Sequence, residues 1–309
     1  MSKENAKVLL VKPENRLRDP VEDKVLYFVV NTILIIFSLI VLYPLIYILS
    51  SSFSSPIDVA AGRVVFLPVN PSVDGYRAVF SHRHIGIGYR NTIFYTVVGT
   101  AINIAMTLIA AYPLSRKDMP FRGFFMFLFT FTMFFGGGLV PTYILMTQIK
   151  FINTIWVMLI PGALSVYNMI LVRTFIQSSI PGELLEASMI DGCSDTKYFF
   201  IMVLPLSKAV IAVVTLFYAV GHWNSYFTAM IYLNQLELYP LQIILRNILI
   251  ANQVQLNEIV DAELLVRKQG MADLLKHSLI VVSTAPIMCV YPFIQKYFVK
   301  GVMLGSIKG

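Results

Sequence analysis

Six long apolar stretches constrain the possible folds of this chain more than any other feature of its sequence. A helix needs about 20 apolar residues to cross a hydrocarbon core about 30 Å thick, because each residue adds about 1.5 Å. The stretches that reach this length are residues 25–49, 92–114, 123–147, 155–176, 206–233 and 274–299. Only 13% of the residues are charged, too few for a water-soluble fold to cover so much apolar surface. We therefore predict an all-α integral membrane protein with six transmembrane helices.

Lysine and arginine residues near the ends of these stretches predict the side of the membrane that each loop faces. Cytoplasmic loops are enriched in these residues, and short loops carry most of the signal. Basic side chains gather in residues 1–24, in the turn after the second stretch and at the C-terminal end, whereas the short loop between the third and fourth stretches holds Lys150 alone. We predict a cytoplasmic N-terminal segment (1–24), a six-span transmembrane domain (25–299) and a cytoplasmic C-terminal tail (300–309).

This topology also accounts for the net charge of +7. Basic residues that bind nucleic acid usually cluster with exposed aromatic residues, and this chain shows no such cluster, so no nucleic-acid partner is expected. Residues 1–24 are too charged, and the first apolar stretch too long, for a cleaved signal peptide. Cys193 and Cys289 suggest neither a disulfide nor a metal site.

The polar segment between the fourth and fifth stretches, residues 181–205, is far longer than a turn between helices requires. Its pattern predicts two short helices. Pro181 suits a first helical residue, and Gly192 suits a helix end with positive φ. Ser194 or Asp195 can cap a second helix, which we expect to run to Val203 and to end before Pro205. Such a compact pair of helices between two membrane spans indicates a docking site.

The same segment resembles the EAA loop of bacterial ABC importer permeases. Glu186, Ala187, Gly192, Leu204 and Pro205 match the family pattern at its spacing. Ser188 replaces the second alanine, and Met202 replaces an isoleucine. Residues that resemble the maltose-type carbohydrate permeases cover the chain from Asn91 to its end: Asn91-Thr92, Ile190-Asp191-Gly192, Trp223-Asn224, Tyr239-Pro240-Leu241 and residues 295–309. Residues 135–143 and 219–226 look most like permeases assigned to polysaccharide-derived oligosaccharides.

This resemblance implies a type I ABC importer permease fold in a bacterial cytoplasmic (inner) membrane. It implies four kinds of partner: a second homologous permease, two cytosolic ATPase subunits, an extracellular or periplasmic sugar-binding protein, and an oligosaccharide substrate. ATP and Mg²⁺ would be bound by the ATPases, so no cofactor is expected in this chain. The residues implied to couple to the ATPase are Glu183, Glu186, Ala187, Ser188, Asp191, Gly192, Leu204 and Pro205.

Two further groups of residues are candidates for a substrate pathway. Gly136, Gly137 and Gly138 interrupt the third stretch, and irregular backbone at membrane depth is tolerated only inside protein or beside water. These glycines indicate either a pliable segment near the pathway or close packing of helices. In the fifth stretch the polar group His222, Trp223, Asn224, Ser225 and Tyr226 suits a sugar, or else forms an aromatic belt at the membrane interface.

The two long outer loops carry less specific signals. Residues 50–90 contain several prolines and glycines and are expected to be irregular. In residues 233–273, Leu241, Ile244, Leu245, Ile248 and Leu249 follow the spacing of one helix face. This pattern predicts a helix that lies at the outer membrane surface or over the cavity.

Enzyme motifs are missing from the sequence. It contains no Gly-x-x-x-x-Gly-Lys-Ser/Thr phosphate loop, no His-Glu-x-x-His pair and no Gly-x-Ser-x-Gly elbow. We therefore expect a permease subunit that does not itself hydrolyse ATP. The alternatives are a permease for another small solute, or an ion-driven secondary transporter, which would need carboxylates within the spans or an inverted repeat.

Overall fold

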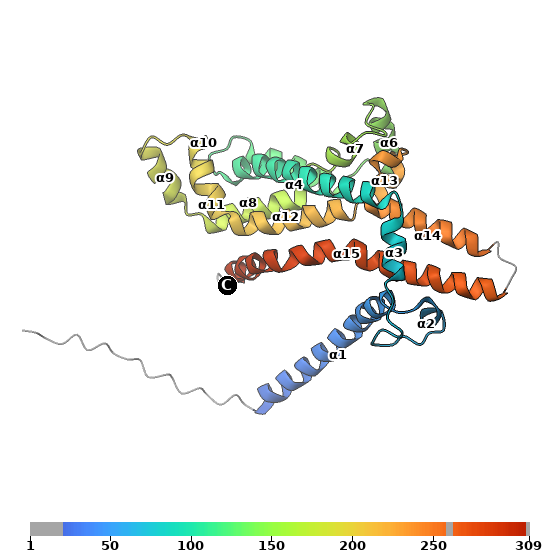
Figure 1. The fold of residues 1–309 in the computed structure, drawn as a ribbon. Helices are drawn as coiled ribbons and strands as arrows, with labels where there is room; N and C mark the ends of the chain where they lie inside the picture. The colour runs from blue at the N-terminus through green and yellow to red at the C-terminus, as the bar shows by residue number, and fades with distance from the viewer. Residues whose placement is uncertain (1–20, 258–261, 307–309) are drawn as a thin grey trace, which may run out of the picture. The chain divides into compact units, whose positions relative to one another are not determined.

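The computed structural model describes residues 21–257 and 262–306, and in this part of the chain every regular element is a helix (Figure 1). The chain divides into two compact units, residues 1–47 and 48–309, which are considered separately. The principal helices are α1 (Val21–Ser52), α2 (Pro56–Ala60), α3 (Asp74–Ser81), α4 (Ile85–Ser115), α5 (Arg122–Phe134), α6 (Leu139–Gln148), α7 (Trp156–Leu159), α8 (Val166–Ser179), α9 (Gly182–Ile190), α10 (Asp195–Tyr198), α11 (Leu204–Leu206), α12 (Lys208–Trp223), α13 (Phe227–Tyr232), α14 (Leu241–Asn257) and α15 (Ala262–Ser306).

Three described helices are long and apolar enough to cross a membrane by themselves. They include residues 23–52 of α1, all of α4 and residues 268–289 of α15. Helix α1 begins at Val21, four residues before the first predicted stretch. Most of the predicted N-terminal segment, residues 1–20, lies outside the described residues. Helix α15 continues through Ser306, so the backbone of the predicted tail is helical up to that point, and residues 307–309 lie outside the described part.

Three of the predicted spans are interrupted rather than straight. The fifth stretch divides into α12 and α13 at residues 224–226. The third stretch forms α5 and α6, whose axes bend by 110° at the three glycines, where Gly138 has a φ of +81°. The fourth stretch forms α7, an irregular segment of residues 160–165, and α8. Pro161 lies in this segment and has no N–H to continue a helix, and the Ser165 hydroxyl accepts a bond from the Asn168 N–H at the start of α8.

Helix α4 is at the centre of the larger unit, where it packs against α8, α12 and α14. The apolar face predicted in the second outer loop is confirmed, because Leu241, Ile244, Leu245 and Ile248 of α14 are buried. These residues pack in one cluster with residues of α3, α4 and α15. The helix therefore covers other helices of its own chain rather than lying separately at the surface.

The expectation that residues 50–90 are irregular is only partly correct, since α2 and α3 form within them. Asp58 organises this region although it is almost fully buried. Its carboxylate accepts hydrogen bonds from Asn70 and Ser55 at 2.7 Å each and from Arg63 at 3.0 Å. The bonds from Asn70 and Ser55, together with Arg63, hold the pKa of Asp58 below its usual value. Ser55 and Asp58 follow the local spacing of a helix cap, whereas the bond from Asn70 joins residues 12 positions apart and leaves no local pattern.

Candidate functional site

The segment between α8 and α12 forms the predicted pair of short helices. Helix α9 begins directly after Pro181, which stands one position earlier than predicted, as its N-cap residue. Gly192 follows the helix end with a φ of +69°, as its sequence position predicted. Ser194 caps α10 by accepting a hydrogen bond from the Lys197 N–H. We call residues 181–206 the coupling loop.

The prediction that the second helix ends before Pro205 is wrong. After α10 the chain forms one wider π-helical turn, Phe199–Val203, and then continues as α11 through Pro205 to Leu206. Proline inside a helix loses one hydrogen bond, and its ring clashes with the carbonyl group four residues earlier. The wider turn displaces those carbonyls just ahead of Pro205, so the helix continues to a bend of 79° before α12.

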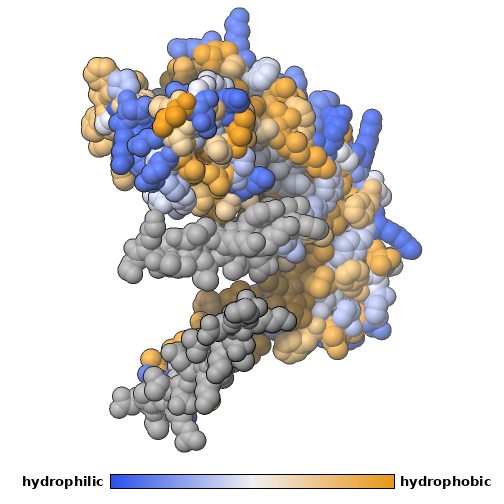
Figure 2. Space-filling model, turned by 90° about the vertical axis from the view of Figure 1, so that its left-hand side faces the viewer, coloured by the Kyte–Doolittle hydropathy of each residue, from blue (hydrophilic) through white to orange (hydrophobic). Residues whose placement is uncertain are grey.

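Most of the predicted coupling residues lie on the surface of this chain. Glu183, Glu186, Ala187, Asp191 and Gly192 are exposed, as is the neighbouring Ile190, with 87% of its surface accessible. Pro205 is also exposed, and Leu204 is half-buried. Ser188 is buried, and its hydroxyl donates to the Leu185 carbonyl. Figure 2 faces this end of the larger unit, where hydrophilic and apolar residues are mixed. Large apolar side chains beside free carboxylates are typical of a surface that binds another protein.

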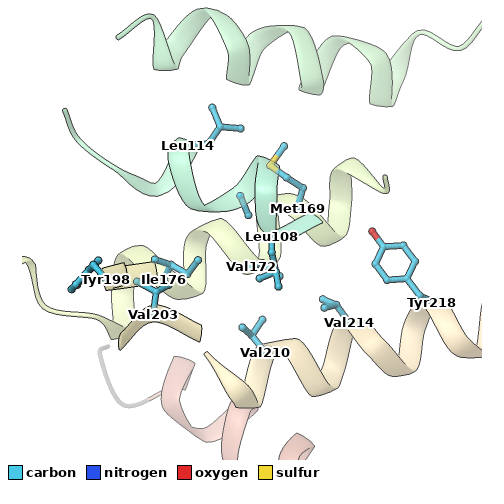
Figure 3. Close-up of a cluster of buried hydrophobic side chains, with 11 residues drawn as sticks. Leu108, Leu114, Met169, Val172, Ile176, Tyr198, Val203, Val210, Val214 and Tyr218 are labelled. Carbon is cyan, nitrogen blue, oxygen red and sulfur yellow. The ribbon is translucent and has the colours of Figure 1, made fainter. Parts of the chain in front are cut away.

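The inner side of the coupling loop is anchored in a buried cluster, which we call the coupling cluster (Figure 3). Tyr198 and Val203 come from the loop and are 4% and 1% exposed. The other members come from α4, α8 and α12: Leu108, Ala111, Leu114, Met169, Val172, Ile176, Val210, Val214 and Tyr218. Close-packed interiors have little free volume and transmit displacements. The loop is therefore in direct mechanical contact with three helices of the larger unit.

Arg116 joins the coupling loop to the turn after α4. In the sequence it contributes only to the basic charge of that turn, which predicts a cytoplasmic position. Its guanidinium donates to Asp118 at 2.8 and 2.6 Å and to Asp195 of the coupling loop at 2.6 Å. The hydrogen bond from Arg116 holds the pKa of Asp118 below its usual value, so Asp118 is charged at neutral pH. A pairing across residues so distant in sequence leaves no local signal.

We expect Arg116→Gln to weaken coupling without preventing assembly. Both carboxylates are mostly exposed, so solvent screens the pairs, and each contributes roughly 0.2–1 kcal/mol. Sugar-dependent ATP hydrolysis by the assembled importer should fall about threefold, an effect of that order. Lys208→Gln, which removes an exposed positive charge at the start of α12, is the control. Equal activity of wild type and Arg116→Gln at low and high salt would show that these bonds do not matter for coupling.

A groove of about 670 Å³ lies beside the coupling loop. Glu186, Met189 and Tyr198 line it from the loop, and Arg116 and Lys117 line it from the turn after α4. Charges of both signs are therefore present along one recess, next to exposed apolar side chains. A partner that enters this groove needs complementary charges and an apolar contact surface.

The structure separates the polar group of the fifth stretch instead of gathering it on one surface. Trp223 is 7% exposed, and its indole N–H donates to the Ser283 carbonyl of α15 at 2.9 Å. Asn224 is exposed and bonds to the Val220 carbonyl of its own helix. Tyr226 is half-buried, with the Arg246 guanidinium 5.9 Å from its ring centre. The pathway role of these residues, and of His222, stays a prediction.

Gly136, Gly137 and Gly138 are exposed in this chain. Among the described residues, a Cβ built at each of these glycines would meet a single atom within 4 Å, the Cβ of Pro141 at Gly137. Most phenylalanines of α5 are exposed as well. This surface is consistent with contact to lipid or another subunit, and the pathway role of the glycines stays a prediction.

His222 instead lines a cavity of about 250 Å³ between α4, α12 and the break before α8. Polar residues around this cavity are Asn103, Tyr218, His222, Ser225 and Thr228, and apolar residues include Met158, Pro161 and Phe217. Tyr218 also belongs to the coupling cluster. One continuous set of contacts thus runs from the coupling loop to this cavity.

Comparisons with known proteins agree with this arrangement. The chain is 39% identical to the polygalacturonan/rhamnogalacturonan transport system permease protein YtcP of Bacillus subtilis over 276 residues, which cover 89% of this chain and 96% of YtcP. It is 38% identical to protein LplC of the same organism, covering 87% of this chain and 90% of LplC. A crystal structure of a bacterial ABC transporter involved in the import of the acidic polysaccharide alginate matches with a TM-score of 0.80 at 34% identity, covering 90% of this chain and 98% of that chain.

The matched family model covers residues 103–304, which include α5 to α14 completely, the C-terminal part of α4 and nearly all of α15. Its members are permease components, and ATP is hydrolysed by separate subunits. On this match and on the extent of its similarity to YtcP and LplC, the chain belongs to the family of binding-protein-dependent transport system inner membrane components.

Proposed function

We propose that this chain is a permease subunit of an ABC importer for oligosaccharides released from polysaccharides. One observation carries the proposal: in a chain of this family, an exposed coupling loop is anchored in the buried core of the larger unit. The names of YtcP and of the alginate transporter support a polysaccharide-derived cargo. A binding-protein-dependent family also argues against the ion-driven alternative.

In this proposal the importer contains a second homologous permease, two cytosolic ATPases that bind ATP and Mg²⁺, and an extracellular or periplasmic sugar-binding protein. The chain crosses the bacterial cytoplasmic membrane six times, with both termini in the cytoplasm. The six spans are formed by α1, α4, the bent pair α5 and α6, the interrupted pair α7 and α8, α12, and α15. This arrangement places the coupling loop and the turn at Arg116 on the cytoplasmic side, which is consistent with the basic residues nearby.

The proposed role of the coupling loop is to link the ATPases to the spans. Binding of ATP shifts the importer toward an outward-facing state only if the ATP-bound ATPases bind that state more tightly. Movement of α9 and α10 would be passed to α4, α8 and α12 through Tyr198 and Val203, because the coupling cluster is densely packed. The coupling loop therefore passes movement of the ATPases to the membrane helices of this subunit.

Reconstitution of the whole importer tests this function. The chain is co-expressed with its neighbouring permease, ATPase and binding-protein genes, purified through a tag on this chain, and placed in proteoliposomes. We expect the subunits to co-purify and to import at least one of trigalacturonate, an alginate trisaccharide and maltotriose with ATP. An assembled complex that hydrolyses ATP in response to its binding protein but imports none of the three sugars would overturn the proposed cargo.

A further inference from the structure

Two arginines come together where α5 packs against α8, and we call Arg122 and Arg173 the arginine pair. Arg122 is the first residue of α5, and Arg173 lies in the second half of α8. Met126 and Phe129 follow Arg122 at the spacing of one helix face, and both pack against the coupling cluster. Arg122 therefore lies on the face of α5 that packs on other helices, where its positive charge repels that of Arg173.

No acidic side chain neutralises the arginine pair within the described part of the chain. The ion pairs found near it both belong to Arg116, which binds Asp118 and Asp195. Two like charges held close together cost free energy unless a charge of opposite sign lies nearby. An anion bound between the two arginines would remove that cost.

Both guanidinium groups also keep most of their hydrogen-bond donors unused. Arg122 donates through Nη1 to the Arg116 carbonyl at 3.4 Å, and Arg173 donates through Nε to the Leu114 carbonyl at 3.0 Å. A guanidinium carries five N–H groups, and neither side chain has another hydrogen-bond partner among the residues that the structure describes. A carbonyl group has no net charge, so these bonds leave the positive charge in place. The arginine pair can therefore bind an anion that offers several oxygens.

The surroundings of the arginine pair suit the boundary of a membrane. Arg122 directly precedes the third apolar stretch, and Arg173 lies close to the end of the fourth. In the proposed topology both residues therefore lie at the level of the cytoplasmic headgroups. Phe121, Phe124 and Phe127 of α5 are exposed, so a positive site and an apolar surface adjoin each other at a depth that lipids reach.

We propose that the arginine pair binds the phosphate of an anionic phospholipid in the cytoplasmic leaflet, whose acyl chains lie along the exposed phenylalanines of α5. The inference rests on the topology given under the proposed function but not on the identity of the sugar. Phosphate oxygens match the planar fork of a guanidinium, and basic pockets between membrane helices on this side bind such headgroups. A soluble anion would satisfy the arginines but would leave the phenylalanines uncovered, whereas a phospholipid satisfies both.

A lipid bound here would stabilise the part of the subunit that receives movement from the coupling loop. Helix α8 contributes three residues to the coupling cluster, Met169, Val172 and Ile176. Arg173 also holds the end of α4 through its bond to the Leu114 carbonyl. The bound phosphate would therefore link the ends of α4, α5 and α8, and coupling should depend on the fraction of anionic lipid.

The test counts lipids on the complete importer in a non-ionic detergent, by native mass spectrometry, as palmitoyl-oleoyl phosphatidylglycerol is added. Arg122→Gln and Arg173→Gln should each raise the concentration that fills one site about fivefold, since each basic residue near the surface contributes about 1 kcal/mol. Arg122→Lys, which keeps the charge, should lose less. Lys208→Gln, which removes an exposed basic residue at the start of α12, is the control and should bind like the wild type. Phosphatidylcholine with the same acyl chains should bind equally to every form.

Three results would overturn the proposal. The first is equal binding of phosphatidylglycerol by the wild type and both glutamine variants. The second is displacement of the bound lipid by millimolar glycerol 3-phosphate, because the site would then take a soluble anion. The third is weaker binding of labelled ATPase by Arg122→Gln in phosphatidylcholine nanodiscs together with an unchanged lipid count, because the arginine pair would then bind a carboxylate of the ATPase.

Nanodiscs of mixed composition test the link to coupling. Sugar-dependent ATP hydrolysis by the wild type should rise as phosphatidylglycerol replaces phosphatidylcholine, and it should rise less in Arg122→Gln. An equal rise in both would contradict that link. The lipid count needs no sugar, so an importer that binds phosphatidylglycerol through the arginine pair but imports none of the three trisaccharides would refute the proposed cargo and leave the lipid site standing.

Discussion

Replacing Gly192 by valine is expected to abolish sugar-dependent ATP hydrolysis while the chain remains inserted in the membrane. Gly192 has a φ of +69° and no atom within 4 Å of a Cβ built at that position. The cost therefore comes from the backbone and not from a clash, at roughly 1–2 kcal/mol, and more for a β-branched residue. Relief of that strain would change the orientation of α9 relative to α10. ATP hydrolysis by the purified importer, with and without the sugar-loaded binding protein, measures the loss.

Gly192→Asn is the matched control for this prediction. Asparagine adopts positive φ more readily than most residues, so coupling should largely survive. Like valine, asparagine adds a side chain at this position, so the two variants differ in their backbone preference. Membrane insertion is checked by extraction and by co-purification of the second permease. Full coupling in Gly192→Val, or equal losses in both variants, would mean that the left-handed turn is not what coupling requires.

Glu186→Ala is expected to weaken assembly with the ATPases about tenfold or more. Glu186 is exposed beside the groove and forms no hydrogen bond or ion pair within the described chain. Its carboxylate is thus available to a basic or backbone donor of the ATPase, and such a charged hydrogen bond contributes roughly 1.5–3 kcal/mol when sheltered from water. Titration of the permease pair with labelled ATPase in nanodiscs measures the change in dissociation constant.

Glu183 provides the comparison that separates binding from a local effect on the helix. Glu183 lies in the first turn of α9 and Glu186 in the next, and a negative charge near a helix start stabilises the helix by roughly 0.3–1 kcal/mol. If Glu186 acted only in this way, Glu186→Ala would weaken assembly no more than Glu183→Ala. A double-mutant cycle between Glu186 and basic residues of the ATPase surface then locates the partner. Coupling energies near zero for every pair would leave only the helix effect.

Local chemistry explains what the sequence predicted well. The positive φ of Gly192 and the cap at Ser194 depend on residues adjacent in sequence, and the buried face of α14 follows from a spacing within one helix. Each of these features is decided within a few residues. The two-helix form of the coupling loop could be predicted for the same reason, because it depends on residues within the loop itself.

Features decided by contacts between distant segments were not foreseen. The pairing of Arg116 with Asp195 joins parts of the chain 79 residues apart, and the buried position of Trp223 depends on Ser283 of α15. The apolar composition of residues 155–176 predicts a fourth span but not its interruption at Pro161. Hydropathy shows how long an apolar stretch is and does not show whether its backbone stays helical. The position of Pro205 predicts a helix end, but the wider turn of residues Phe199–Val203 lets the helix continue through it.

The buried indole of Trp223 also has a spectroscopic consequence. The chain contains two tryptophans, and the other, Trp156, is 49% exposed. In a Trp156→Phe background the remaining indole sits at the contact between α12 and α15, with its N–H bonded to a backbone carbonyl. Its emission wavelength then reports whether these two helices stay together as the importer changes state. Stopped-flow fluorescence would follow that contact in real time without an attached dye, provided that the partner subunits have their own tryptophans replaced.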